Sequence, residues 1–194
     1  MKKRTTMLAL LLATGAGTCL QAQEKLTQFK VRDAITVRTP IMNDSINPKG
    51  EKYADKDLLK TPVVLDLADA PFQVLSTDTA GVLSFPKAEK DHSIYLLETS
   101  LRAERFMTGK LKVTSPARWE IFINGESKMS KENAEDSISG ASTREVNLRL
   151  EPEADYEITI KLLSGSKDKA VPTLKCELIK DDKFKDITCF VSPE

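Results

Sequence analysis

The sequence predicts an all-β fold in which antiparallel strands form a β-sandwich, and three observations support this prediction. First, Asn124-Gly125 is a strong signal for a two-residue hairpin, because a type I′ turn needs positive φ at both central positions. Second, apolar residues alternate with polar ones on both sides of this turn, which is typical of half-buried strands. Third, short runs of this kind recur at sandwich-like spacing over residues 63–194, with almost no helical periodicity.

Residues 1–22 have the organisation of a signal peptide. Lys2, Lys3 and Arg4 form a positive segment, and the short apolar run of residues 7–13 follows it. This run is too short to span a bilayer, and small residues come after it. We therefore expect cleavage after Ala22 and an exported chain, periplasmic or extracellular, as in Gram-negative bacteria. The alternative is a lipoprotein in which Cys19 carries the lipid.

Residues 23–62 are the predicted arm between this signal and the sandwich. Residues 34–37 are apolar enough for one short strand, and residues 55–60 favour one helical turn before Pro62. Proline, asparagine and glycine residues between these two segments break any longer element. A solvated linker without fixed structure is the alternative interpretation of the arm.

The predicted sandwich domain, residues 63–194, begins with an apolar strand at residues 63–67. A hairpin follows, in which residues 72–75 and 82–85 flank the turn Asp78-Thr79-Ala80-Gly81. Pro116 marks a corner, because proline cannot donate to a central strand ladder. Residues 130–139 favour a short surface helix with Ser130 as its N-cap. The later strands are expected at residues 93–100, 106–115, 119–123, 146–150 and 156–162.

A final hairpin is predicted around the turn Asp182-Lys183. The residues that alternate around it are Leu174, Cys176 and Leu178 on one strand and Ile187, Cys189 and Val191 on the other. A two-residue turn places Cys176 opposite Cys189, with all six side chains on one face. Directly opposed residues lie close enough for a disulfide, and exported proteins meet oxidising conditions. We therefore expect a Cys176–Cys189 disulfide; two buried free thiols are the alternative.

The charge balance bears on the class of partner. The chain has 29 basic and 29 acidic residues, and loss of the signal peptide removes three basic residues, which leaves 26 against 29 and a net charge of −3. Nucleic-acid binding usually requires a basic surplus, so no nucleic-acid partner is expected. No other apolar run is long enough to cross a membrane.

The sequence contains no recognisable catalytic constellation, so we expect a protein that is not an enzyme and holds no metal or cofactor. His92 is the one histidine, and it falls in a polar turn where a solvated side chain is the ordinary outcome. No second histidine is present for a zinc site. No G-x-S-x-G elbow, P-loop or G-x-G-x-x-G fingerprint occurs.

Two further features are candidate sites. Trp119 is the only tryptophan, and aromatic platforms bind sugars; its alternation with Ile121 and Ile123 favours the core instead. Three segments fit the pattern Asp-[Ser/Thr]-apolar, which resembles the O-glycosylation acceptor motif of exported proteins in some Gram-negative bacteria. Polar turns or caps are the alternative for these segments. The candidate acceptors are Ser45, Thr79 and Ser137.

The segments SIYLLETSLRAERFMTGKLKVTSPARWEIFINGES and REVNLRLEPEADYEITIKLL resemble the galactose-binding-like jelly roll, a β-sandwich. Three segments also resemble the N-terminal, non-catalytic region of exported prolyl-oligopeptidase-type (S9) serine peptidases. They are PIMNDSINPKGEKYADKDLL, LKVTSPARWEIFINGESKMSKENAEDS and YEITIKLLSGSKDKAVPTLK.

In those peptidases a β-propeller and an α/β-hydrolase domain follow this region, and neither is present here, so no catalytic residue carries over. The resemblance implies an accessory module that acts by contact with a propeller–hydrolase protein partner. A carbohydrate-binding module is the alternative, which the jelly-roll pattern favours, and a surface adhesin or assembly subunit is a further one.

Overall fold

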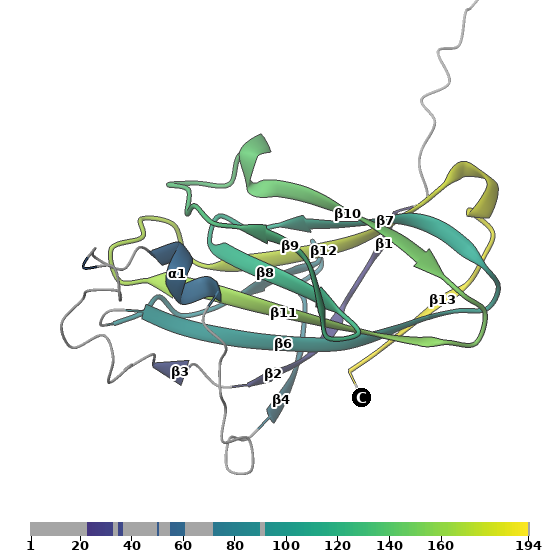
Figure 1. Ribbon diagram of the computed structural model, residues 1–194, viewed down its shortest axis with the longest axis horizontal. Helices are drawn as coiled ribbons and strands as arrows, with labels where there is room; N and C mark the ends of the chain where they lie inside the picture. The colour runs from purple at the N-terminus through teal and green to yellow at the C-terminus, as the bar shows by residue number, and fades with distance from the viewer. Residues whose placement is uncertain are drawn as a thin grey trace, which may run out of the picture.

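The structure, a computed structural model, describes residues 23–32, 35–36, 50, 55–60, 72–89 and 92–193. These residues form two antiparallel β-sheets, which Figure 1 shows as two layers. The five-stranded sheet has the order β1 (Gln23–Lys25), β12 (Thr173–Lys180), β7 (Met107–Thr114), β10 (Thr143–Leu150), with β5 (Val82–Ser84) also on β12. The eight-stranded sheet has the order β4 (Phe72–Ser76), β2 (Gln28–Arg32), β6 (His92–Ala103), β11 (Asp155–Gly165), β8 (Arg118–Ile123), β9 (Glu126–Lys131), with β3 (Ile35–Thr36) and β13 (Cys189–Ser192) also on β6. The predicted all-β sandwich is confirmed.

The main hydrophobic core lies between the two sheets, because alternate residues of each strand point inward. Trp119, Ile121 and Ile123 on β8 are buried, as their alternation predicts. Leu111 and Val113 on β7 belong to the same core and come from the other sheet. Each buried aliphatic side chain contributes about 1.5–3 kcal/mol, so this core is the main source of the fold's stability.

The Asn124-Gly125 turn joins β8 to β9, as predicted. Asn124 has φ 51° and Gly125 has φ 75°, the two positive values that a type I′ turn needs. The backbone N–H of Asn124 donates to the carbonyl of Glu157 at 2.8 Å, and the Asn124 Oδ1 accepts from the Glu157 N–H at 2.9 Å. The hairpin is therefore anchored to β11 by its turn as well as by its strands.

Residues 23–32 are part of the sandwich, which corrects the predicted arm of residues 23–62. β1 pairs with β12, and β2 pairs with both β4 and β6. Leu26 and Phe29 are buried in the main core. The alternation signal is weak here because β1 and β2 span only three and five residues.

Two other predictions for the arm agree with the structure. β3 lies inside the predicted strand of residues 34–37, and the helix α1 (Asp55–Lys60) matches the predicted helical turn. Residues 1–22 and 63–67, with the predicted signal peptide, Cys19 and the first predicted strand of the sandwich, lie outside the described residues.

The predicted hairpin at the end of the chain is wrong. β12 lies in the five-stranded sheet, whereas β13 lies in the eight-stranded sheet and pairs with β6. The chain crosses between the sheets through a 3₁₀ turn, η3 (Asp182–Phe184). Cys176 and Cys189 are both buried, as the alternation predicts, but both are free thiols and the predicted disulfide is not formed. Alternation determines the face of a strand and leaves its partner strand open.

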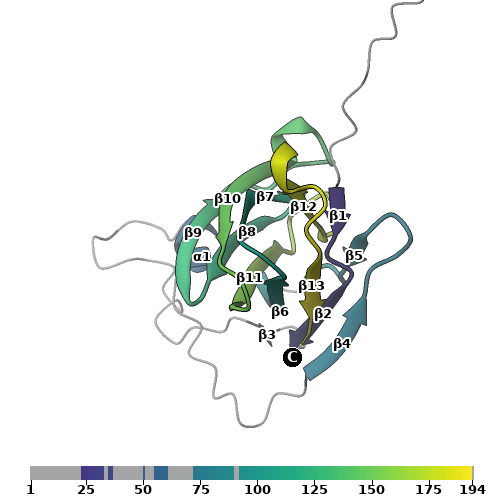
Figure 2. The same ribbon diagram turned by 90° about the vertical axis from the view of Figure 1, so that its right-hand side faces the viewer.

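The turn Asp78–Gly81 is formed, but it does not join paired strands. The Val82 N–H donates to Asp78 Oδ1 at 2.8 Å, and Gly81 takes the positive φ of 84°. β4 nevertheless pairs with β2, and β5 pairs with β12. The chain therefore passes from one sheet to the other at this edge of the sandwich (Figure 2).

Residues 130–139 do not form the predicted helix. Ser130 and Lys131 end β9, where Lys131 pairs in register with Trp119, and an irregular loop follows up to the 3₁₀ turn η2 (Gly140–Ser142). The Lys131 side chain is buried and its Nζ donates to the carbonyl of Asn133 at 2.6 Å. Strand pairing with β8 therefore overrides the capping preference of Ser130.

Candidate functional site

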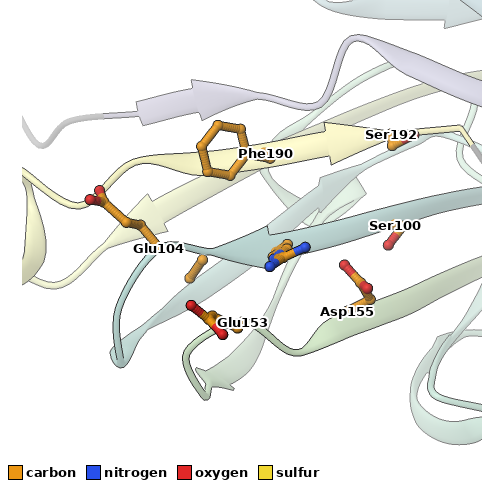
Figure 3. Close-up of a pocket in the computed structure, with 8 residues that line it drawn as sticks. Ser100, Glu104, Glu153, Asp155, Phe190 and Ser192 are labelled. Atoms are coloured by element: carbon orange, nitrogen blue, oxygen red, sulfur yellow. The ribbon is translucent and has the colours of Figure 1, made fainter.

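An open cleft of about 740 Å³ lies on the outer face of the eight-stranded sheet, and we call it the Phe190 cleft. Figure 3 shows Phe190 and Ser192 on one side of β6, with Glu153 and Asp155 on the other side. Its volume is in the range of small-molecule sites in proteins. The residues that line it are Ser100, Arg102, Ala103, Glu104, Glu153, Asp155, Phe190 and Ser192.

The strand register brings an aromatic ring, a guanidinium and a carboxylate into one row. On β6, Arg102 lies directly opposite Phe190 of β13 on one side and opposite Asp155 of β11 on the other. The neighbouring residues Leu101 and Ala103 are fully buried, so Arg102 projects from the outer face. Directly opposed side chains on one face are close enough to contact one ligand together.

Two loops close one end of the cleft. The Glu104 N–H donates to the carbonyl of Thr188 at 3.1 Å, and the Glu153 N–H donates to the carbonyl of Ala103 at 3.3 Å. Glu153 has the positive φ of 59°, at the bend between β10 and β11. These backbone hydrogen bonds hold both acidic residues beside the end of β6.

The charged side chains of the cleft are available for a ligand. Among the described residues, Arg102, Glu104, Glu153 and Asp155 make no side-chain hydrogen bond or ion pair with one another or with a neighbour. All four are exposed. Carboxylates and a guanidinium form charge-assisted hydrogen bonds with hydroxyl groups of a bound molecule, and these bonds are stronger than hydrogen bonds between neutral groups.

The structure buries the aromatic candidate Trp119 and exposes a second aromatic residue, Phe190. Trp119 is fully buried in the core, as its alternation with Ile121 and Ile123 predicts, so the alternative interpretation of Trp119 as a ligand platform is wrong. Phe190 is 56% exposed and was not predicted as a site residue. The signal was present in the sequence, because Phe190 stands between Cys189 and Val191 and so faces the opposite side of their strand.

The free cysteines are structural. The Cys189 Sγ lies 3.3 Å from the Met107 Sδ, and Cys176 is 1% exposed among core residues. Burial raises the pKa of both thiols above the ordinary value. A raised pKa leaves little reactive thiolate, so neither thiol is set up as a nucleophile.

Two of the three glycosylation candidates are exposed. Thr79 lies in the turn after β4, where its carbonyl accepts a hydrogen bond from Lys25 Nζ at 3.0 Å, and its side chain faces solvent. Ser137 lies in the loop after β9, beside Ile138, which is 59% exposed. Ser45 lies outside the described residues.

His92 belongs to an ion-pair cluster that holds α1 on the sheet. Its Nε2 is 3.1 Å from Asp55 Oδ1, and Arg118 binds both Asp55 and Asp168. At the other end of α1, the buried Lys161 donates to the carbonyl of Leu59. The described contacts of this cluster join the start of α1 to β6, to β8 and to the loop before β12, and so they position α1.

A second polar cluster lies in the loop after β9. Glu135 accepts hydrogen bonds from Ser139 Oγ at 2.8 Å and from Ser142 Oγ at 2.5 Å, and Lys131 Nζ lies 3.5 Å from its other oxygen. Burial lowers the pKa of Lys131. Ser142 is fully buried, so no substrate reaches its hydroxyl and the cluster serves to order the loop.

The described residues offer neither a membrane-spanning helix nor a cluster of metal-ligating side chains. They contain no helix that is both long enough and apolar enough to cross a membrane. Nor do they contain three or more His, Cys, Asp or Glu side chains grouped so as to hold a metal ion.

Comparison with known proteins gives structural likenesses only. No protein-family profile matches the chain, and no curated protein matches it. A β-glucosidase from Kluyveromyces marxianus in complex with glucose is similar with a TM-score of 0.48 and 14% identity, over 72% of this chain and 18% of that chain. The PA14 sugar-binding domain from an RTX adhesin is similar with a TM-score of 0.34 and 17% identity, over 52% of each chain.

A GH31 α-xylosidase from Xanthomonas citri is similar with a TM-score of 0.39 and 8% identity, over 82% of this chain and 19% of that chain. The match therefore spans about a fifth of each glycosidase and about half of the adhesin domain. None of the three is described as an S9 peptidase, and the S9 relation stays a prediction.

Proposed function

We propose that this chain is a non-catalytic carbohydrate-binding module and that the Phe190 cleft is its binding site. The observation that carries the proposal is the exposed ring of Phe190 in a cleft whose charged side chains have no partners in the described structure. This is the combination of an aromatic platform and polar neighbours that a sugar-binding site requires.

The chemistry of a pyranose ring matches this combination. One face of the ring presents aliphatic C–H groups, which pack on a phenyl ring and remove apolar surface from water. Its hydroxyls point outward, where Glu153 and Asp155 accept hydrogen bonds and Arg102 donates them. The open shape of the cleft on a sheet face gives access to a residue within a longer glycan chain.

Exposure of the three carboxylates supports a binding role over glycoside hydrolysis. A catalytic acid of a glycosidase needs a raised pKa, which comes from burial or from a close second carboxylate. Glu104, Glu153 and Asp155 are all exposed, and none of the described residues that line the cleft is a buried carboxylate. The predicted export of the chain fits this proposal, because polysaccharides are abundant outside the cytoplasm.

The accessory role beside a peptidase propeller and hydrolase rests on the sequence resemblance alone. It predicts a direct contact between this chain and a separately expressed propeller–hydrolase chain. A pull-down between the two purified proteins tests that contact independently of sugar binding.

The test of the proposed function is isothermal titration of the mature chain with oligosaccharides chosen from a glycan array. The Phe190→Ala variant should weaken binding by about twofold to tenfold, since loss of an aromatic stacking contact costs about 0.5–1.5 kcal/mol. Phe106→Ala is the matched control, because Phe106 is also exposed, at 37%, but does not line the cleft. Absence of glycan binding, or equal binding by Phe190→Ala and the wild type, would refute the proposal.

A further inference from the structure

We infer that the Phe190 cleft selects sugars without negative charge, binds amino sugars best and rejects uronic acids and sulfated sugars. This inference rests on the proposed function and specifies its ligand class. Three carboxylates and one guanidinium line the cleft, which gives a formal charge of −2. The sign of that charge determines which charged ligands can approach.

The one cation of the cleft lining is poorly placed to bind an anion. Arg102 lies between Phe190 and Asp155 in the strand register, so a ligand anion that reaches the guanidinium also lies beside the Asp155 carboxylate. Asp155 therefore offsets the attraction of Arg102. Glu104 and Glu153 flank the adjoining end of β6 and add two more negative charges.

The surface beyond the cleft continues this pattern along β11. Glu157, two residues after Asp155, is exposed on the same face and lies opposite Ser100 of the cleft. A glycan that extends from the cleft along the strands therefore meets a further carboxylate. A protonated amine on the glycan has several acceptors within reach, whereas a carboxylate or sulfate meets repulsion that low salt makes stronger.

The experiment uses β-linked tetramers of glucose, glucosamine and glucuronic acid, which share one backbone and differ in charge. In low-salt titrations of the mature chain, the glucosamine tetramer should bind most tightly. The glucuronic acid tetramer should bind about tenfold more weakly than the glucose tetramer, or not at all. Raising the salt concentration should bring the three affinities together.

Charge-removing variants test the residues. The double variant Glu153→Gln/Asp155→Asn should narrow the difference in affinity between the glucosamine and glucuronic acid tetramers. It should weaken binding of the glucose tetramer as well, because neutral amides accept weaker hydrogen bonds from the sugar hydroxyls than carboxylates do. Arg102→Gln should widen the preference. Glu126→Gln is the control, since Glu126 is exposed in the β8–β9 hairpin and does not line the cleft.

The failures of the two proposals are distinguishable. Suppose that the glucuronic acid tetramer binds as tightly as the glucose tetramer and that Phe190→Ala weakens both. This result would overturn the inference and would still support the proposed function. An unchanged preference in the double variant would likewise overturn it. If none of the tetramers binds and the glycan array is also empty, the proposed function fails and the inference fails with it. If the array yields only uronic or sulfated glycans, the inference alone is overturned.

Discussion

Arg118 on β8 binds Asp168 through both oxygens of the carboxylate, with Nη1 3.0 Å from Oδ1 and 2.8 Å from Oδ2. The same guanidinium binds Asp55 at the start of α1 through Nη2. The Arg118 and Asp168 side chains are only 11% and 13% exposed. One arginine therefore connects α1, the start of β8 and the loop before β12.

Replacement of Arg118 by glutamine should destabilise the fold by about 2–4 kcal/mol, because it leaves a poorly solvated carboxylate without its partner. Urea unfolding monitored by circular dichroism measures the free energy of unfolding. Lys128→Gln is the control: Lys128 pairs with Glu126, which is 74% exposed, and its loss should cost less than about 0.5 kcal/mol. Equal effects of the two substitutions would contradict this account of the cluster.

Gly109 lies where β7 and β12 approach too closely for a side chain. A Cβ at this position would lie 2.4 Å from the carbonyl oxygen of Ile179. Gly109→Ala should therefore push the two strands apart and cost about 1–3 kcal/mol. Gly140→Ala is the matched control, since nothing lies within 4 Å of its Cβ position, and it should change stability by less than about 0.5 kcal/mol. Thermal unfolding of both variants decides the point.

The buried thiols should make the fold less stable in alkali. Burial raises the pKa of the Cys176 and Cys189 thiols, so the folded state keeps protons that the unfolded chain releases above about pH 8.5. The contribution of these thiols to the free energy of unfolding is therefore fully present below that pH, and it falls as the pH rises above it. The stability advantage of the wild type over Cys176→Ala should shrink by about 1 kcal/mol between about pH 7 and about pH 9.5. Leu178→Ala is the control, because Leu178 is buried and does not titrate. The difference in stability between the wild type and Leu178→Ala should stay constant over the same pH range.

The same two cysteines should be free in the purified protein. Cys176 lies in the five-stranded sheet and Cys189 in the eight-stranded sheet. Titration of denatured, unreduced protein should therefore find both thiols. If the titration finds neither thiol, the Cys176–Cys189 disulfide that the sequence predicts is formed after all. The pairing of β13 would then differ from the pairing described above.

Thr79 and Ser137 should be modified if the chain is made in a host that O-glycosylates Asp-[Ser/Thr]-apolar segments, since both side chains are exposed. Glycopeptide mass spectrometry detects this modification. Asp136→Ala should abolish modification of Ser137 alone, because it removes the acidic residue of that segment. The fold should tolerate this change, since the Asp136–Lys169 ion pair is 71% and 73% exposed. An unmodified wild-type peptide in such a host would contradict the prediction.

The fold class and the strand faces could be predicted from the sequence because they depend on local patterns. Trp119, Cys176 and Cys189 are buried, and Asn124-Gly125 forms its turn, as period-2 alternation and turn chemistry require. The errors concern partners in space. In a sandwich a short loop can join two strands of the same sheet or two strands of opposite sheets. The turns after β4 and after β12 join strands of opposite sheets.

The Phe190 cleft could not be predicted from the sequence for the same reason. The outward position of Phe190 follows from its neighbours in the sequence, but its position beside Arg102 and Asp155 depends on the pairing of β13 with β6 and of β6 with β11. These contacts join residues 102, 155 and 190, and no local pattern specifies such pairs. The positive φ of Glu153 is a further feature that its residue type does not predict.

The pairing of β1 with β12 affects how the protein acquires its structure during synthesis. Residues 23–25 pair with residues 177–179, so β1 cannot pair until nearly the whole chain has been synthesised. At ordinary elongation rates this delay is on the order of ten seconds. Chains whose strands pair over such long separations also fold slowly once complete. The nascent chain therefore passes through a long period with unpaired strand edges, during which holding chaperones and proteases compete for it.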